Sequence, residues 1–550
     1  MAAILAIAAW AVPVSARGAA VHFDIGRSFP GVSYGTFNTN SSALPPDCNG
    51  DIGPNHYVEF VNGVFAVYSK TSGGQVEFKT DIDFWASAGV GIDTSEWGVS
   101  DPRVIYDPLS QRWFASQIDV DELTQVFDGV LGTNHFLLAV SDTADPTGPW
   151  HGTLFDSDPD SGNFADFPTL GVDSEGVYLA ADMFDSAGDP TTATDIACSL
   201  VMFRKTDLLA TNFNNPTFFP NMSFAARGQI YQPATCADGS GVGCVLAAGD
   251  IGSDSSFHSN LVTFAVQNVA GPGAATLGPS SFLTVLPYQV PDNVAVGTPL
   301  LTALQPDGTT TLQANDARFS AKVYTVGGIA YGVHNTLLNG RVAIRWYRIS
   351  VASGALVESG TLADPDLDLF YPSIAANLSG TVVIGCNSSG PGTNYISGCA
   401  FVGQTVNQVT TFNPRVIVCA GVTSYHGDDE DTSGLGLGNP TSRWGDYSAT
   451  GIDPTDSSRF WTIQMFPTDV NVWSTRITEL VTTPLQLLAS QSGTNVTVSW
   501  PSLLVGYQLQ FATNITSTVW SNVTQTPLTN GTMLYVTQPL SRGNRFFRLQ

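Results

Sequence analysis

Charged residues are scarce in this chain of 550 residues: they make up 12%, about half the usual share in globular proteins. Basic residues are the scarcer kind, with 21 Lys and Arg against 47 Asp and Glu, and the formal net charge is −26. A nucleic-acid-binding protein normally carries a basic face, and anionic membrane surfaces attract basic clusters. The composition therefore argues against nucleic acids and anionic membranes as partners.

The sequence also lacks a long apolar segment beyond its N-terminus, where no run reaches the roughly 18 residues that a membrane helix needs. At the N-terminus itself, Ala2 to Val14 is apolar, and Val14-Ser15-Ala16 fits the small-x-small rule for signal-peptide cleavage. We therefore predict a secretory signal over residues 1–20 and a secreted protein without a membrane span, although no Lys or Arg precedes the apolar run. A buried N-terminal strand or helix is the alternative.

The seven cysteines include no C-x-x-C pair and the seven histidines are scattered, which disfavours a zinc site. Cys236 and Cys244 flank a glycine-rich turn, and Cys386 and Cys399 flank a second segment between predicted strands. In an oxidising compartment these spacings predict two disulfides, Cys236–Cys244 and Cys386–Cys399. Three cysteines remain, so at least one thiol is free or the pairing differs.

Glycine (54) and proline (32) are plentiful, and short runs of β-branched and aromatic residues lie between them. This composition suits short strands joined by turns, and no convincing helical period is present. One pattern recurs from Asp47 to Asp446: an acidic or aromatic residue, a short apolar strand, a turn, and a second strand. Because the repeats are about 66 residues long, they accommodate three or four strands and inserted loops.

These repeats predict an all-β fold with a seven-bladed β-propeller over residues 21–481, six blades being the alternative. A set of separate sandwiches is a weaker hypothesis, because no linker-like segment interrupts residues 21–480. After Thr482-Thr483-Pro484 the pattern changes to short alternating strands, such as Asn495 to Trp500. We predict a small β-sandwich of immunoglobulin or fibronectin type III style over residues 482–550.

Five stretches of the sequence carry a family resemblance: PPDCNGDIGPNHYVEFVNGVFAVYSK (45–70), DPRVIYDPLSQRWF (101–114), DFPTLGVDSEGVYLAADMF (166–184), RVAIRWYRI (341–349), and SRWGDYSATGIDPTDSSRFWTIQ with WSTRI (442–464, 473–477). Through them the chain resembles a group of secreted bacterial proteins of unassigned function, and RWGDY is the most specific part. The resemblance implies a propeller-like fold and no particular catalytic residues. The tail, with VSWP and a terminal FFRL, is similar to C-terminal modules of secreted verrucomicrobial proteins.

In a propeller, the first residues of the inner strands face a shared central channel. Asp47, Asp101, Asp166, Tyr371 and Asp446 occupy such positions in the predicted strands. Carboxylates that converge there could bind Ca²⁺, which takes six to eight oxygen ligands, or hydrogen-bond the hydroxyls of a sugar. The alternative is that each side chain caps its own Pro- or Gly-containing turn.

Arginines are few, so Arg318 and Arg443 are further candidates for the channel face. A sialidase needs arginines that clamp a carboxylate, a Tyr nucleophile and an acidic partner. Tyr371 or Tyr447, with Asp101 or Asp446, could supply the last two. The Ser-x-Asp-x-Gly-x-Thr-Trp box of sialidases is not present in the sequence, and ion pairing between blades is the alternative role of the arginines.

Asp156, Asp158 and Asp160 have the alternate-carboxylate spacing of a calcium loop. The segment departs from the EF-hand pattern, because Ser161 holds the usual Gly position and Phe167 the usual Glu position. Ca²⁺ is therefore the cofactor that the sequence predicts, with these three aspartates as ligands.

Together these features predict a secreted propeller that binds a glycan or a surface polymer at its channel face, with the C-terminal sandwich as an accessory or sorting module. A glycoside hydrolase or lyase with the same face as its active site is the alternative, because propellers support both functions. Carboxylates about 5–10 Å apart beside an open pocket would favour hydrolysis. Carboxylates buried in hydrogen bonds to turns would favour binding or scaffolding.

Overall fold

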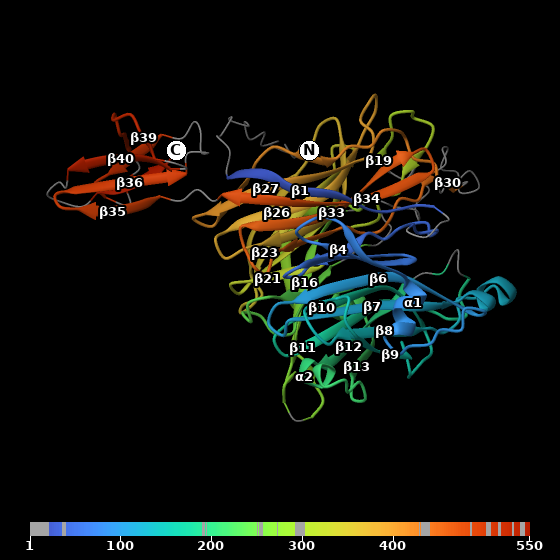
Figure 1. The fold of residues 1–550 in the computed structure, drawn as a ribbon. Coiled ribbons are helices and arrows are strands. Elements are labelled where there is room, and N and C mark those ends of the chain that lie inside the picture. Colours follow the sequence, from blue (N-terminus) through green and yellow to red (C-terminus); the bar gives the residue numbers. More distant parts are fainter. Residues whose placement is uncertain are drawn as a thin grey trace, which may run out of the picture.

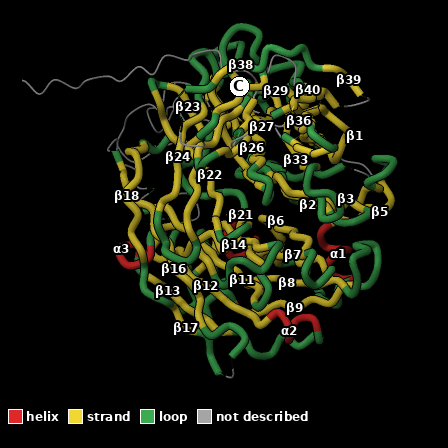
Figure 2. Tube along the Cα trace, turned by 90° about the vertical axis from the view of Figure 1, so that its left-hand side faces the viewer, coloured by secondary structure: helices red, strands yellow, loops and turns green. Residues whose placement is uncertain are grey.

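The computed structural model describes residues 21–35, 40–189, 193, 195–249, 251, 257–271, 273–291, 303–427, 429–430, 441–483, 487–501, 508–514, 517, 519–530, 533–539 and 545–549. The signal predicted over residues 1–20 lies outside them. Strands dominate the described part, so the all-β prediction is confirmed. Figure 2 shows its short helices at the edge of the strands. These helices are α1 (Asp81–Ser87), α2 (Lys205–Leu209), α3 (Phe224–Arg227) and the π-helix η1 (Thr124–Asp128).

The strands before residue 484 form antiparallel meanders (Figure 1). Each of the first three has its own sheet, and their strands are β2 (Asn49–Ile52), β3 (His56–Val61), β4 (Val64–Ser69) and β5 (Gln75–Thr80); β6 (Trp97–Asp107), β7 (Arg112–Asp121), β8 (His135–Ser141) and β9 (Trp150–Asp156); and β10 (Phe164–Val172), β11 (Gly176–Phe184), β12 (Asp195–Arg204) and β13 (Thr217–Met222).

The next two meanders share one nine-stranded sheet, because β14 and β21 pair in parallel. The strands of this sheet are β14 (Gln229–Cys236), β15 (Cys244–Ala248), β16 (His258–Gln267), β17 (Thr276–Leu277), β18 (Ser281–Tyr288), β21 (Val323–Val326), β22 (Ile329–Leu338), β23 (Arg341–Ser350) and β24 (Leu356–Leu362).

The last two meanders again have their own sheets. Their strands are β25 (Asp368–Ala376), β26 (Thr381–Ser389), β27 (Ser397–Val406), β28 (Val409–Phe412) and β29 (Val416–Cys419); and β32 (Ala449–Ile452), β33 (Arg459–Asp469), β34 (Val472–Thr483) and β1 (His22–Ser33). A small separate sheet contains β19 (Ala303–Leu304), β20 (Thr311–Leu312), β31 (Thr441–Ser442) and β30 (Asp429–Glu430).

The first strands of the seven meanders form a closed ring. Each of β2, β6, β10, β14, β21 and β25 contacts the first strand of the next meander, and β32 contacts β2. At the outside of the last meander, β1 pairs with β34, so the beginning of the described chain completes a sheet built by residues 449–483. A closed ring of this kind leaves only short sheet edges exposed.

Five of the seven first strands have an irregular backbone angle within the strand or just before it. Positive φ angles occur at Asp47 (47°), Asp101 (60°), Phe167 (49°), Ile230 (52°) and Tyr371 (48°). In the last four strands a register shift accompanies the positive φ angle. Such angles are uncommon outside glycine, and bulges of this kind bend a strand and redirect its side chains. The sequence-predicted openings therefore coincide with real bends in the chain.

The C-terminal strands form two sheets that enclose a core of their own. The four-stranded sheet contains β35 (Leu488–Ser492), β36 (Asn495–Pro501), β40 (Met533–Pro539) and β39 (Leu528–Asn530), and the three-stranded sheet contains β38 (Ser521–Asn522), β37 (Leu509–Ala512) and β41 (Phe546–Leu549). Val498, Trp500, Leu509 and Val536 pack between them. In Figure 1 this part is set apart from the ring. Among the described residues, no helix is long and apolar enough to cross a membrane.

Both predicted disulfides are wrong, because all seven cysteines are buried free thiols in the structure. The Cys236 Sγ atom accepts a hydrogen bond from the Gly241 backbone N–H at 3.3 Å and lies 3.4 Å from Asp238 Oδ1. Cys386 and Cys399 lie directly opposite each other on β26 and β27. The Cys399 thiol instead contacts Ser388 Oγ and Arg415 Nη1, each at 3.1 Å.

Candidate functional site

The seven side chains that the sequence placed at the channel face do lie together, around the bends of the first strands. We call this set the axial cluster; its members are Asp47, Asp101, Asp166, Arg318, Tyr371, Arg443 and Asp446. Most of these side chains are buried, and Asp166, Arg318 and Arg443 are partly exposed. The cluster thus gathers four carboxyl groups and two guanidinium groups from distant parts of the chain.

Asp47 and Asp101 are connected through Asn62, the first residue of the turn from β3 to β4. The Asn62 Nδ2 atom donates to Asp47 Oδ2 at 2.9 Å, and the Asp101 backbone N–H donates to Asn62 Oδ1 at 3.0 Å. Asp47 Oδ1 is buried and has no hydrogen-bond partner in the described part of the chain. Burial, reinforced by the nearby Asp446 and Asp101 carboxylates, raises the pKa of Asp47 well above its usual range, against the opposing charge of Arg443.

Asp101 has the most informative protonation behaviour in the cluster. Burial raises its pKa to about 7, and the charges of Asp166 and Asp446 act in the same direction. Arg103 and a 2.9 Å hydrogen bond from Ser100 Oγ oppose the shift. Near neutral pH the Asp101 carboxyl group is therefore divided between its protonated and ionised forms.

Asp446 is held differently, by an ion pair with Arg443 at 2.9 Å. The Asn315 Nδ2 atom donates to its other carboxylate oxygen at 3.2 Å, and Arg443 Nη1 donates to Gln313 Oε1 at 3.0 Å. Between them, Gly445 has φ +156°, and a Cβ atom there would lie 2.9 Å from the Met465 Cε atom. Glycine therefore permits the bend that brings Arg443 and Asp446 together.

Arg318 is bound mainly by Asp316, which the sequence did not indicate. Its Nε and Nη2 atoms donate to both Asp316 carboxylate oxygens at 2.7 to 3.0 Å. Its guanidinium group also lies over the Phe167 ring, 4.4 Å from the centroid. Burial raises the pKa of the neighbouring Asp166, while the charge of Arg318 opposes the shift. The arrangement of Arg318 is thus an intrachain carboxylate clamp with aromatic stacking.

Arg103 lies among the first strands of the ring. Its guanidinium lies 3.5 Å from the Tyr447 ring centroid and 5.1 Å from that of Phe167. It donates to the carbonyl oxygens of Pro168 at 2.9 Å and Ser320 at 2.8 Å. Because these partners come from three parts of the chain, β10 and the segments that precede β21 and β32, Arg103 connects several parts of the ring.

No family model and no curated protein matches this chain. Solved structures match it at low similarity. A protein of unknown function from Dyadobacter fermentans is 11% identical, with a TM-score of 0.31, and the match covers 70% of this chain and 95% of that one. The GH93 α-L-arabinofuranosidase of Fusarium graminearum in complex with arabinobiose is 12% identical, with a TM-score of 0.36 and coverages of 82% and 98%. An endo-arabinase from Bacteroides thetaiotaomicron is 12% identical, with a TM-score of 0.29 and coverages of 70% and 96%.

The predicted calcium loop has a different organisation from an EF-hand. Asp158 is buried, and its carboxylate accepts hydrogen bonds from Asn163 Nδ2 at 2.8 Å and Asn221 Nδ2 at 3.0 Å. Asp156 accepts the Asp158 backbone N–H at 3.1 Å, and Asp160 is exposed. Among the described residues, no group of three or more His, Cys, Asp or Glu side chains has the arrangement of a metal site. Calcium binding by these three aspartates stays a prediction.

Several members of the site were missed by the sequence analysis. Gln313, Asn315 and Asp316 lie between β20 and β21, outside every predicted strand. Asn62 is the first residue of the turn between β3 and β4. Asp182 is buried on β11, and burial, with the Asp195 charge, raises its pKa well above its usual range. A polar residue some positions before an apolar strand was the available signal for the first three. It is a weak one, because such residues also terminate ordinary turns.

Asp101→Asn is expected to remove a pH dependence of stability. The pKa of Asp101 is about 7 in the fold and near 3.8 ordinarily, so between these values the folded state holds a proton that the unfolded chain releases. The stabilisation is complete below about pH 4 and is lost as the pH rises through 7. Asparagine mimics the protonated form, so the variant should gain melting temperature relative to the parent from pH 5 to pH 8. A difference in melting temperature between variant and parent that does not change with pH would contradict this prediction. The control is Asp366→Asn, at an exposed position.

Proposed function

We propose that this chain is a secreted protein in which residues 21–481 form a seven-bladed β-propeller that binds a glycan or a surface polymer at the axial cluster. The closed ring of seven first strands supports the propeller. The residues 482–550 would be an immunoglobulin- or fibronectin type III-like module with an accessory or sorting role.

The observation that carries the binding function is the convergence of donors and acceptors in the axial cluster. Its carboxyl groups accept hydrogen bonds and its guanidinium groups donate them, whereas a sugar hydroxyl does both. Arg443 and Arg318 are its partly exposed cations, with side-chain exposures of 26% and 17%. A glycan would therefore meet Arg443, Arg318 and Asp166 first, while Asp446 and Asp316 hold the two guanidinium groups in place.

One observation favours a second candidate function, glycoside hydrolysis. Asp101 is partly protonated near neutral pH, and Asp446 forms an ion pair with Arg443. Two carboxyl groups in different environments are what an acid and a base or nucleophile require. In this alternative Asp101 is the general acid and Asp446 the ionised partner.

A glycan array and a panel of chromogenic glycosides, each with and without Ca²⁺, test both functions. We expect saturable binding of at least one glycan class, and a loss of about tenfold or more in affinity for Asp166→Asn, since hydrogen bonds to charged groups contribute about 1.5–3 kcal/mol. The control is Asp366→Asn. Turnover that Asp101→Asn abolishes would establish the hydrolase. If no arm shows binding and no arm shows turnover, the proposed function is refuted. A Ca²⁺ requirement that Asp158→Asn removes would confirm the calcium loop.

A further inference from the structure

A pocket of about 220 Å³ lies at the opposite end of the ring from the axial cluster. Where the axial cluster gathers around the beginnings of the first strands, this pocket is lined by residues at their ends. Asp51 and Ile52 end β2, Tyr106 is next to last in β6, and Ile452 ends β32. We call it the carboxyl-end pocket. No feature of the sequence pointed to it.

An ion pair forms part of the wall of this pocket. Lys322 Nζ donates to Asp51 Oδ2 at 2.7 Å, and the two side chains are 10% and 7% exposed. The Asp51 carboxylate is fixed further by the backbone N–H groups of Ile52 at 3.0 Å and Tyr106 at 3.1 Å. An ammonium group has three N–H donors. Within the described chain, Lys322 uses one of them on a protein acceptor, so two remain for a ligand.

Two tyrosines add hydroxyl groups to the same wall. Within the part of the chain that the structure describes, neither the Tyr106 nor the Tyr324 hydroxyl has a hydrogen-bond partner, and both residues line the pocket. Burial raises the pKa of Tyr324 well above its usual range, and the charge of Asp51 adds to the shift. Both hydroxyls therefore keep their protons and can donate to a ligand.

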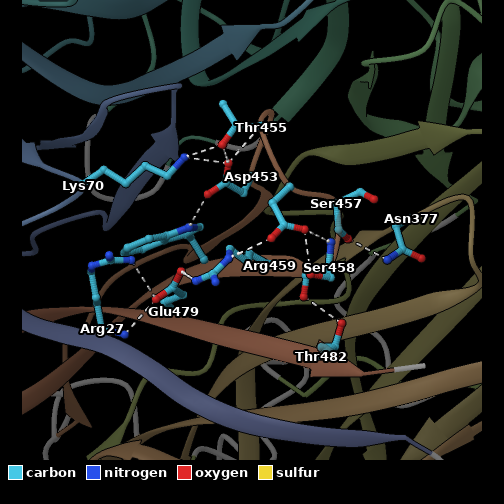
Figure 3. A network of polar contacts seen from close by, with 12 residues as sticks. Arg27, Lys70, Asn377, Asp453, Thr455, Ser457, Ser458, Arg459, Glu479 and Thr482 are labelled. Carbon is cyan, nitrogen blue, oxygen red and sulfur yellow. Dashed lines mark hydrogen bonds and ion pairs between the residues drawn. The ribbon is translucent and has the colours of Figure 1, made fainter. Parts of the chain in front are cut away.

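The rim of the pocket is fixed by hydrogen bonds of its own, which Figure 3 shows. Lys70 Nζ pairs with Asp453 Oδ1 at 2.7 Å, and the Thr455 backbone N–H donates to the same oxygen at 2.9 Å. Asn377 Nδ2 donates to the Ser457 carbonyl oxygen at 2.7 Å. Asn377, Asp453 and Ser457 all line the pocket. Because these rim groups are ordered in advance, ligand binding loses little conformational entropy there.

We infer that the carboxyl-end pocket binds a single neutral sugar residue. The paired Lys322 and Asp51 offer a cation and an anion side by side. This suits two adjacent hydroxyls of a sugar, one accepting a hydrogen bond from Lys322 and one donating to Asp51. An anionic ligand would meet the Asp51, Asp238 and Asp453 carboxylates, and a cationic ligand would meet Lys322. Ile52, Val326 and Ile452 supply apolar surface for the C–H face of the ring.

This inference is independent of the proposed function at the axial cluster, and the test separates the two. Saturation-transfer difference NMR with a panel of neutral methyl glycosides measures binding to the parent protein and to three variants. Leu378→Trp should block the pocket mouth without disturbing the core, because Leu378 lines the pocket and is 74% exposed. Tyr324→Phe removes one hydroxyl and keeps the ring. Val409→Trp, at a residue of β28 that is 55% exposed, is the matched control.

We expect at least one methyl glycoside to bind, with binding lost in Leu378→Trp, weakened about tenfold in Tyr324→Phe as for one lost hydrogen bond, and unchanged in Val409→Trp. Asp166→Asn, which tests the axial cluster, should leave this binding intact. The inference is overturned if no neutral glycoside binds, if carboxylate-bearing sugars alone bind, or if Leu378→Trp binds like the parent. Sensitivity to Asp166→Asn with indifference to Leu378→Trp would place the binding at the axial cluster.

Discussion

Arg443→Ala should lower the free energy of unfolding by about 3 kcal/mol, because it leaves buried carboxylates without their cation. Asp446 is 8% exposed and has its 2.9 Å ion pair with Arg443. The positive charge of Arg443 also holds down the pKa values of Asp47 and Asp166. The expected loss is at the lower end of the range for buried pairs, since the Arg443 side chain is itself 26% exposed.

The pH dependence of this loss identifies its cause. Without Arg443, the neighbouring carboxyl groups can relieve their repulsion by taking up protons, so the destabilisation should be smaller at pH 5 than at pH 8. Urea unfolding at both pH values measures it. Arg443→Lys keeps a charge and should recover part of the stability. The control is Arg112→Ala, at a guanidinium group that donates to the carbonyl oxygen of the adjacent Gln111 at 3.3 Å. An Arg443→Ala protein that unfolds like the parent but loses ligand binding would show that the pair serves binding rather than the fold.

The sequence was most informative about strands whose apolar residues are continuous and whose turns contain glycine. The sequence predicts strands from His56 to Asn62 and from Val64 to Ser69, and the structure has β3 and β4 there. The strand β14 (Gln229–Cys236) was missed, because Pro233 interrupts its pattern and proline normally excludes a central strand. Here Pro233 lies next to a register shift in the β14–β15 pair, where the ladder is already irregular.

The last meander shows why local pattern alone misplaces an element. The local pattern of residues 442–450 predicts one inner strand, whereas β32 begins at Ala449 and Ser442 belongs to β31. Arg443 to Ser448 have no strand structure, because side-chain contacts with Gln313, Asn315 and Asn387 shape this segment. Partners more than 50 residues away leave no trace in the local sequence.

The residues of the candidate site likewise divide into those that the local sequence indicates and those that only long-range contacts bring together. Five of its seven predicted members were found because each lies at the opening of a predicted strand, and Arg318 and Arg443 were found because arginines are few in this chain. The Arg443–Asp446 pair joins two predicted members, whereas Asp316, which binds Arg318, and the carboxyl-end pocket were not found. Lys322 and Asp51 are 271 positions apart, and only the closed ring brings them together. Chemistry that depends on such long-range pairs requires the fold before it can be recognised.

Glu59→Ala is expected to have the largest effect on stability, about 4 kcal/mol, because it combines a cavity with several lost hydrogen bonds to a buried carboxylate. Glu59, on β3, is completely buried. It accepts the Val32 backbone N–H of β1 at 3.1 and 3.2 Å, the Tyr68 hydroxyl at 2.8 Å and the Thr475 hydroxyl of β34. One carboxylate therefore connects β3, in the first meander, with β1 and β34, the two outermost strands of the last meander.

The loss of stability in Glu59→Ala should be concentrated at β1 and β34, where the ring closes. Burial raises the pKa of Glu59, and its three donors oppose the shift because each stabilises the ionised carboxylate. Glu59→Gln keeps the volume but places an NH₂ group against a donor, and its stability should lie between those of the parent and Glu59→Ala. Glu122→Ala, at an exposed position, should unfold like the parent. Hydrogen exchange of residues 22–33 should accelerate in Glu59→Ala well before that of β11 and β12. If exchange rises equally throughout the ring, or if guanidinium unfolding of Glu59→Ala matches the parent, Glu59 does not hold the closing strand.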